Sequence, residues 1–179
     1  MLCPRDARRG FARGHAALRR IVAAYAGTVP EIVRVSASYG APPRAEGLEL
    51  SLSHCDEVIL VAVASVPIGI DVESLDAVGG ATHLADLAEL TLAPREAERF
   101  SATQAGARAA AWVRWFVRKE ASLKSRGLGL SDVALTDVEV LDDRTDDRTL
   151  VDFTLGDGYV GAVALRHPGA LLRWKELEA

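Results

Sequence analysis

The sequence has only two cysteines, Cys3 and Cys55, and it lacks long apolar runs. The cysteines are not spaced as metal ligands and nothing suggests secretion, so we expect free thiols in a reducing compartment. The longest apolar run, residues 58–64, is far shorter than the roughly 20 residues that a membrane-spanning helix needs. Arginines rather than an apolar segment follow the first residues, so we expect no signal peptide. Together these absences predict a cytoplasmic protein with no membrane partner.

An excess of basic side chains is also missing. The formal net charge is -4 at pH 7, whereas a general nucleic-acid binder needs many basic side chains for its phosphate contacts. The charge is unevenly spread, because residues 1–20 carry six arginines and one aspartate while residues 137–152 carry seven acidic side chains. We therefore expect no nucleic-acid partner, and one end of the molecule is suited to an anion or an acidic partner.

An apolar fraction of 49% is enough to build a folded core. Two predicted hairpins have similar sequences and both end in an apolar strand that contains alanine. This internal similarity predicts an α+β fold of two similar halves, residues 1–75 and 76–179, related by a pseudo-two-fold axis. We expect the active site in the cleft between the halves. The periodicity predicts helices over 6–26, 83–90 and 94–100, strands over 31–36 and 68–73, and hairpins over 48–64 and 150–165.

The segment 112–130 has a clear helical period ended by glycines, and we place the chemistry there. Glu120 and Lys124 share one stripe with Val113 and Val117, which are typical of a buried face. A glutamate four residues before a lysine is most often a surface pair worth about 0.2–0.5 kcal/mol, but this pair follows bulky aromatic residues. The face expected to pack on a sheet carries Trp112, Trp115, Phe116 and Leu123. The stripe expected to be solvated carries Arg114, Arg118 and Ser125.

The predicted strand 68–73 carries two acidic residues. Alternation places the side chains of Asp71 and Glu73 on one face and those of Ile70 and Val72 on the other. Two adjacent carboxylates that are even half-buried need a cation, and Mg²⁺ suits carboxylate and phosphate oxygens. The spacing alone is equally compatible with two solvated acids at an exposed strand end.

Three motifs occur in order along the chain: SLSH at 51–54, GIDVE at 69–73 and KEASLK at 119–124, followed by GLGL at 127–130. In this order and spacing they resemble the Sfp-type 4'-phosphopantetheinyl transferases, over a span from about residue 5 to the end. A single serine and histidine, such as Ser53 and His54, would otherwise be interpreted as turn formers at the end of a hairpin strand. Each motif is weak alone, and the three together carry the resemblance.

The resemblance implies a reaction and a set of residues. Asp71, Glu73 and Glu120 would hold Mg²⁺ on the pyrophosphate of coenzyme A, and Lys124 would neutralise charge on the phosphate under attack. A serine of a carrier protein would attack the β-phosphate and release 3',5'-ADP. Either Glu120 or a bound water would take the serine proton. Such chemistry depends on charge neutralisation and in-line positioning.

The resemblance also implies a coenzyme A site in which Ser53 and His54 contact the nucleotide. The family pattern has a further strand and helix ahead of the segment that matches here, with basic residues for the 3'-phosphate. Its YGKP loop reads YGAP here, so Ala41 replaces a lysine. Another departure is Val117, where a small hydroxyl or thiol residue is common. We hypothesise from charge alone that other cations substitute, namely Arg44, Arg13 or Arg9.

The leading hypothesis is an active transferase that modifies an acyl, peptidyl or polyketide carrier protein. Carrier domains are acidic, and the basic faces of the first and central helices would suit them. The main alternative is a relative that binds carrier protein or coenzyme A without turnover. A third possibility is a two-lobed α+β protein whose acids form only surface pairs, which the three spaced motifs disfavour. A two-lobed chain could work as a monomer.

Overall fold

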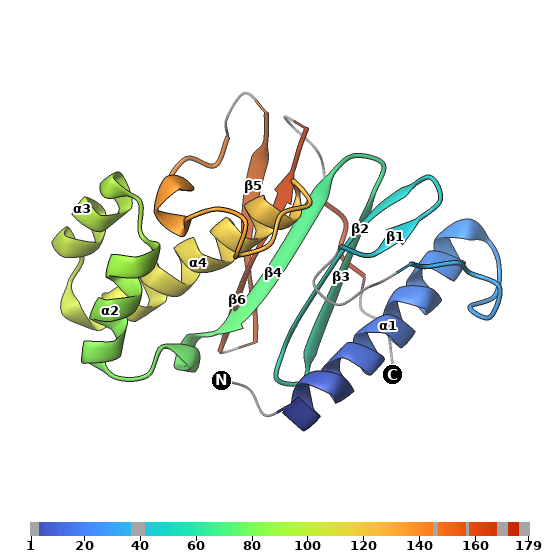
Figure 1. The fold of residues 1–179 in the computed structure, drawn as a ribbon, viewed down its shortest axis with the longest axis horizontal. Helices are drawn as coiled ribbons and strands as arrows, with labels where there is room; N and C mark the ends of the chain where they lie inside the picture. Colours follow the sequence, from blue (N-terminus) through green and yellow to red (C-terminus); the bar gives the residue numbers. More distant parts are fainter. Residues whose placement is uncertain (1–3, 37–41, 145–146, 157, 168–171, 176–179) are drawn as a thin grey trace.

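The computed structural model describes residues 4–36, 42–144, 147–156, 158–167 and 172–175, and the side chains of all of these except 4–12 and 77. In its first part, helix α1 (Pro4–Ala26) packs on an antiparallel sheet of order β1-β2-β3 (Figure 1). The strands are β1 (Arg44–Ala45), β2 (Leu48–Cys55) and β3 (Val58–Ala64). Leu18 and Val22 of α1 and Leu50 of β2 are buried in one cluster. The apolar face of α1 therefore covers one face of this sheet, as its amphipathic period predicts.

The second sheet is antiparallel with the order β4-β6-β5. Its strands are β4 (Ile68–Ser74), β5 (Thr149–Leu155) and β6 (Tyr159–Leu165). Helix α4 (Arg108–Lys124) crosses one face of this sheet, with α2 (Ala81–Thr91) and α3 (Pro94–Ala102) beside it (Figure 1). Short 3₁₀ turns lie at Leu75–Val78, Ala105–Ala107 and Leu135–Asp137. The α+β class is confirmed, with four helices and two three-stranded sheets in the described part of the chain.

The two sheets meet where β2 lies against β4. The backbone N–H of Ile70 donates to Ser51 Oγ at 3.0 Å, and that of Val72 donates to Ser53 Oγ at 3.3 Å. Two serine hydroxyls therefore satisfy backbone donors at the edge of β4. This places β2 directly beside the strand that carries Asp71.

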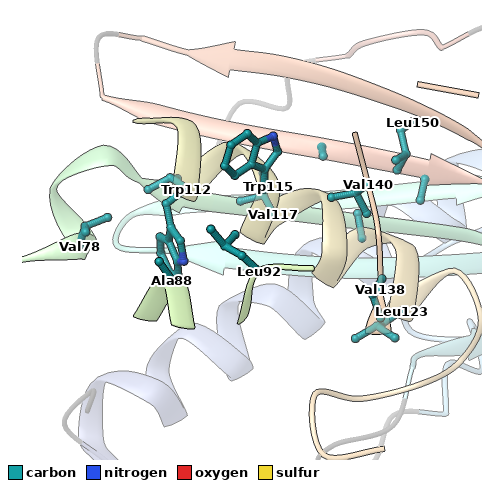
Figure 2. Close-up of a cluster of buried hydrophobic side chains, with 14 of the residues drawn as sticks. Val78, Ala88, Leu92, Trp112, Trp115, Val117, Leu123, Val138, Val140 and Leu150 are labelled. Atoms are coloured by element: carbon teal, nitrogen blue, oxygen red, sulfur yellow. The ribbon is translucent and has the colours of Figure 1, made fainter. Parts of the chain in front are cut away.

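The largest cluster of buried side chains surrounds α4 (Figure 2). Val113 and Val117 are completely buried, as predicted, and so is Ala121. Trp112 contacts α2, since its indole N–H donates to Thr91 Oγ1 at 2.9 Å. Its ring also stacks on Phe116 with centroids 4.9 Å apart. The stripe and the aromatic residues thus belong to one buried cluster, in which Trp112 links α4 to α2.

The contact between α4 and β4 is unusually close at Gly69. A Cβ atom at this position would lie 1.9 Å from the carbonyl oxygen of Ala121 and 2.6 Å from the backbone nitrogen of Ser125. Only a residue without a side chain fits there. Backbone therefore packs on backbone, and the next residues on this face of β4 lie directly under the last turns of α4.

Two predictions made from periodicity were wrong. Residues 31–36 do not form a strand, because Ser36 alone makes an isolated bridge, to Arg44. The alternation of Val33 and Val35 is satisfied by packing on the α1 cluster without a ladder. Two members of the stripe expected to be solvated, Arg118 and Ser125, are buried with 3% and 4% exposed, while Arg114 is exposed as expected.

Arg118 is buried because acidic side chains of residues 137–152 neutralise it. Its guanidinium donates to both oxygens of Asp152, to Asp143 and to the carbonyl oxygen of Val140. Arg148 is buried nearby and donates to Ser122 Oγ at 2.9 Å. Part of the acidic stretch 137–152 therefore neutralises a buried arginine within the chain.

The two predicted hairpins are confirmed, as β2–β3 and β5–β6. Their third strands differ, because the seven-residue β4 pairs with β6 whereas the two-residue β1 pairs with β2. The division of the chain after residue 75 stays a prediction, and the β4–β6 ladder joins strands from both sides of it. No helix in the described residues is both long and apolar enough to span a bilayer.

Substituting Gly69 by alanine tests the close packing of α4 on β4. Because the new methyl group would meet backbone atoms that cannot rotate away, we expect the free energy of unfolding to fall by at least about 2 kcal/mol. Urea unfolding followed by circular dichroism measures this loss. Gly106→Ala is the control, since nothing lies within 4 Å of a Cβ there. Equal unfolding midpoints for the two variants would contradict the interpretation.

Candidate active site

Four charged side chains from two elements come together beneath the end of α4. Asp71 and Glu73 lie on the face of β4 that also carries Gly69, and this face meets α4. Glu120 and Lys124 lie one turn apart at the C-terminal end of α4, and their charged groups are 3.5 Å apart. The structure therefore brings together the four residues that the sequence predicted for metal binding and catalysis.

Asp71 is the most deeply buried of the four, with 3% of its surface exposed. Its Oδ1 accepts hydrogen bonds from Ser53 Oγ at 2.8 Å and from Lys124 Nζ at 2.6 Å. Its Oδ2 is also buried but has no hydrogen-bond donor among the described residues. A buried carboxylate oxygen without a partner is costly, so this atom is suited to a cation.

Lys124 is the cation of this group. Its Nζ contacts Asp71 Oδ1 at 2.6 Å and Glu120 Oε2 at 3.5 Å, and it donates to the carbonyl oxygen of Ile70 at 3.3 Å. Burial lowers the pKa of Lys124, but the charges of Asp71 and Glu120 outweigh it and the pKa is raised above its ordinary value. Lys124 therefore remains protonated at neutral pH.

Lys124 compensates the other two carboxylates, Glu73 and Glu120, only in part. Burial, followed by the charge of Asp71, raises the pKa of Glu120 to about 7. The same two causes, in the same order, raise the pKa of Glu73. The thiol of Cys55 donates to Glu73 Oε2 at 3.6 Å, and burial and Glu73 raise the pKa of Cys55 to about 11. One lysine facing three carboxylates leaves a charge that a divalent cation would balance.

The chemistry of these residues fits magnesium. The candidate ligands, Asp71, Glu73 and Glu120, all offer carboxylate oxygens, which this hard ion prefers. One of these oxygens, Asp71 Oδ2, has no hydrogen-bond donor among the described residues. In the described residues, however, no three acidic, histidine or cysteine side chains are already arranged as a metal site. The set thus has the charge and donor type for a metal, while the ligand geometry itself is not preformed.

Comparison with known proteins shows to which family the span that contains these residues belongs. A sequence model of the 4'-phosphopantetheinyl transferase superfamily matches residues 67–167, more than half of the chain. The chain belongs to this superfamily. No curated protein matches it. Membership indicates phosphopantetheinyl transfer, with coenzyme A as the substrate and carrier proteins as acceptors. The matched span includes β4 and α4, and therefore all four charged residues.

Ser53 and His54, predicted to contact the nucleotide of this transferase's substrate, lie on opposite faces of β2. Ser53 faces β4 and is 6% exposed, with its hydroxyl on Asp71. Leu50 and Leu52 share the face of His54 by alternation, and both pack toward α1. The structure therefore brings Ser53 to the carboxylates but not His54.

The arginines predicted to hold coenzyme A are dispersed. Arg13 pairs with Glu57 at 2.5 Å, just beyond the end of β2, and both side chains are exposed. Arg44 is exposed in β1 and lies opposite Glu49 in the ladder of β1 with β2, near the start of β2. About 20 Å of strand separates these two points, at roughly 3.3 Å per residue. The side chain of Arg9, like Ala41, lies outside what the structure describes. Arg13 and Arg44 are thus not gathered around one phosphate.

A buried ion pair next to the site was not predicted from the sequence. Lys119 and Glu96 are completely buried, with Lys119 Nζ 2.6 Å from Glu96 Oε2. Lys119 also donates to the carbonyl oxygens of Leu135 and Val138. Burial lowers the pKa of Lys119, while Glu96 acts in the opposite direction. Although Lys119 precedes Glu120 in the KE motif, it ties α4 to α3 and to a loop, and it does not enter the site.

The buried carboxylate of Glu96 also has backbone hydrogen-bond partners. Its carboxylate accepts the backbone N–H of Ala93 at 2.9 Å and that of Val140 at 2.9 Å, in addition to the lysine. The first of these bonds caps α3, whose N-cap residue, Ala93, has no polar side chain. A glutamate three residues into a helix is the one sequence signal that could have indicated such a cap.

Replacing Lys119 by methionine tests its structural role. The change leaves Glu96 charged and unpaired in the core, so we expect the free energy of unfolding to fall by about 3–5 kcal/mol. Denaturant unfolding measures it. Arg95→Met removes an arginine whose partner Glu139 lies 2.5 Å away and whose own side chain is 60% exposed, and it should cost less than about 1 kcal/mol. Similar losses in the two variants would refute the assignment.

Proposed function

We propose that the chain is an Sfp-type, magnesium-dependent 4'-phosphopantetheinyl transferase that modifies a serine of an acyl or peptidyl carrier protein. The observation that carries this proposal is the buried group formed by Asp71, Glu73, Glu120 and Lys124. It lies within the span matched by the superfamily. Its three carboxylates are suited to holding the cation that a reaction at a pyrophosphate requires, and its lysine is a further positive charge.

Binding of coenzyme A to this group depends on charge. Three carboxylates would repel a pyrophosphate, so Asp71, Glu73 and Glu120 would act as ligands rather than as direct contacts to the substrate. A bound Mg²⁺ would neutralise the pyrophosphate oxygens and polarise the phosphorus under attack. Lys124 lies at the edge of the same group with 28% of its side chain exposed, and it would offer a second positive charge to the phosphate.

The transfer forms one bond and breaks one. The oxygen of the carrier serine bonds to the β-phosphorus of coenzyme A. The bond from this phosphorus to the bridging oxygen breaks, and 3',5'-ADP leaves with the electron pair. The serine proton passes to Glu120 or to a bound water. The contact between Glu120 and Lys124 would hold the glutamate in place for this role.

The carrier protein would approach the basic side of the molecule. Arg114 and Arg118 of α4 are both paired with Asp152, so the central helix offers less positive charge than the sequence suggested. Arg19 of α1 is exposed. An acidic carrier is therefore more strongly attracted to α1.

Intact-mass spectrometry of a carrier protein tests the proposal. After incubation of apo carrier with the chain, coenzyme A and Mg²⁺, we expect the mass gain of one phosphopantetheine arm. Glu120→Gln should slow this gain by at least about 100-fold, because the amide cannot replace a charged ligand and proton acceptor. The matched control is Glu98→Gln, the same change on the exposed surface of α3, which should leave the rate unchanged.

Removing the metal completes the test. A chelator should abolish the mass gain and added Mg²⁺ should restore it. If several apo carriers show no gain at saturating coenzyme A, the transferase proposal fails and a binding-only relative becomes the better interpretation. Equal rates for Glu120→Gln and Glu98→Gln would instead show that the chemistry lies elsewhere.

A further inference from the structure

The hydroxyl of Ser53 donates its one hydrogen bond to a side chain and accepts another from the backbone. Its oxygen accepts the backbone N–H of Val72 at 3.3 Å, and its hydrogen is donated to Asp71 Oδ1 at 2.8 Å. The side chain is 6% exposed. Because the accepted bond comes from the backbone of β4, the Ser53 side chain cannot move its oxygen away from Asp71 without leaving a buried N–H unsatisfied.

The two donors to Asp71 converge on the same oxygen. Ser53 and Lys124 both contact Oδ1, at 2.8 Å and 2.6 Å, whereas the buried Oδ2 has no donor among the described residues. Two directional bonds on one oxygen stop the carboxylate from rotating about its terminal bond. Ser53 does so as a neutral donor, so it orients the carboxylate without reducing its negative charge.

We propose that Ser53 is a positioning residue of the transferase, which holds Asp71 with Oδ2 presented to the catalytic cation. The inference deepens the proposed function and rests on it. It differs from the sequence-based expectation that Ser53 contacts the nucleotide of coenzyme A. A hydroxyl committed to Val72 and Asp71, in a side chain with almost no exposed surface, has no donor left for a substrate.

Ser51 provides a matched control within the same strand. It lies two residues earlier on the same face of β2, is 3% exposed, and accepts the backbone N–H of Ile70 at 3.0 Å. Ser51 thus makes the same hydroxyl-to-backbone contact across the two sheets. It makes no hydrogen bond to Asp71. Alanine at either position removes one contact between the sheets, but only Ser53→Ala releases the carboxylate.

The first experiment measures binding of Mn²⁺ to the full chain by electron paramagnetic resonance, without coenzyme A or carrier. Loss of a group that orients a metal ligand typically weakens metal binding by 10- to 100-fold, so we expect the dissociation constant of Ser53→Ala to rise about tenfold. The same constant for Ser51→Ala should change by less than about twofold, since Asp71 keeps both donors. Thermal unfolding verifies that each variant is folded.

The second experiment measures the KM for coenzyme A at saturating Mg²⁺. A positioning role predicts an unchanged KM in Ser53→Ala, together with a higher Mg²⁺ concentration for half-maximal rate. A nucleotide contact predicts a higher KM with normal metal binding, and this result would overturn the proposal. Equal weakening of Mn²⁺ binding in both alanine variants would also overturn it, because it would indicate general loosening of the sheet contact.

The metal-binding readout separates this inference from the function. If the chain binds Mn²⁺ but transfers nothing, the proposed function fails and the comparison of Ser53→Ala with Ser51→Ala still decides the role of Ser53. If the chain binds no Mn²⁺, the inference itself is refuted. Should Ser53→Ala fail to fold, Ser53→Cys keeps a similar shape with a weaker donor, and wild-type Mn²⁺ affinity in that variant would refute the proposal.

Discussion

Direct packing of the backbone of α4 on the backbone of β4 is the constraint on which the rest of the structure depends. At Gly69 there is no room for even one carbon atom between the strand and the carbonyl oxygen of Ala121. This distance lets Lys124 reach across to Asp71, two residues further along the strand, while it also contacts Glu120 on its own helix. A helix held one side chain further away would leave the same charges separated by water, where they would interact only weakly.

This close packing brings several carboxylates together under α4. Two further ion pairs hold the helix in that position. Lys119 with Glu96 and Arg118 with Asp152 are buried on other faces of α4. Each pair joins the helix to a different element, and each is satisfied by further hydrogen bonds. Buried pairs of this kind add little net stability but penalise any other placement of the helix. They therefore fix the register of α4 over β4, on which the positions of Glu120 and Lys124 depend.

The sequence predicted those parts of the site that depend on local periodicity. Alternation along β4 placed Asp71 and Glu73 on one face, and the helical repeat placed Glu120 with Lys124. The environment of Arg118 could not be predicted, because its partner Asp152 lies in another element and becomes close only after folding. Ser53 and His54 are different: neighbouring residues of a strand face opposite sides, so one strand could not have brought both to one site. The strand expected at 31–36 failed because two alternating valines are also satisfied by packing on a helix.

The contact between the two sheets has a consequence for solubility. An unpaired strand edge can recruit a strand from another molecule, which leads to aggregation. The hydroxyls of Ser51 and Ser53 occupy two backbone donors on the edge of β4. The acceptors are side-chain oxygens, so β2 and β4 do not pair as strands and the two sheets stay separate. These two donors of β4 are nevertheless satisfied. The same two serines would thus shield the strand that carries the reactive carboxylates from pairing with a foreign chain.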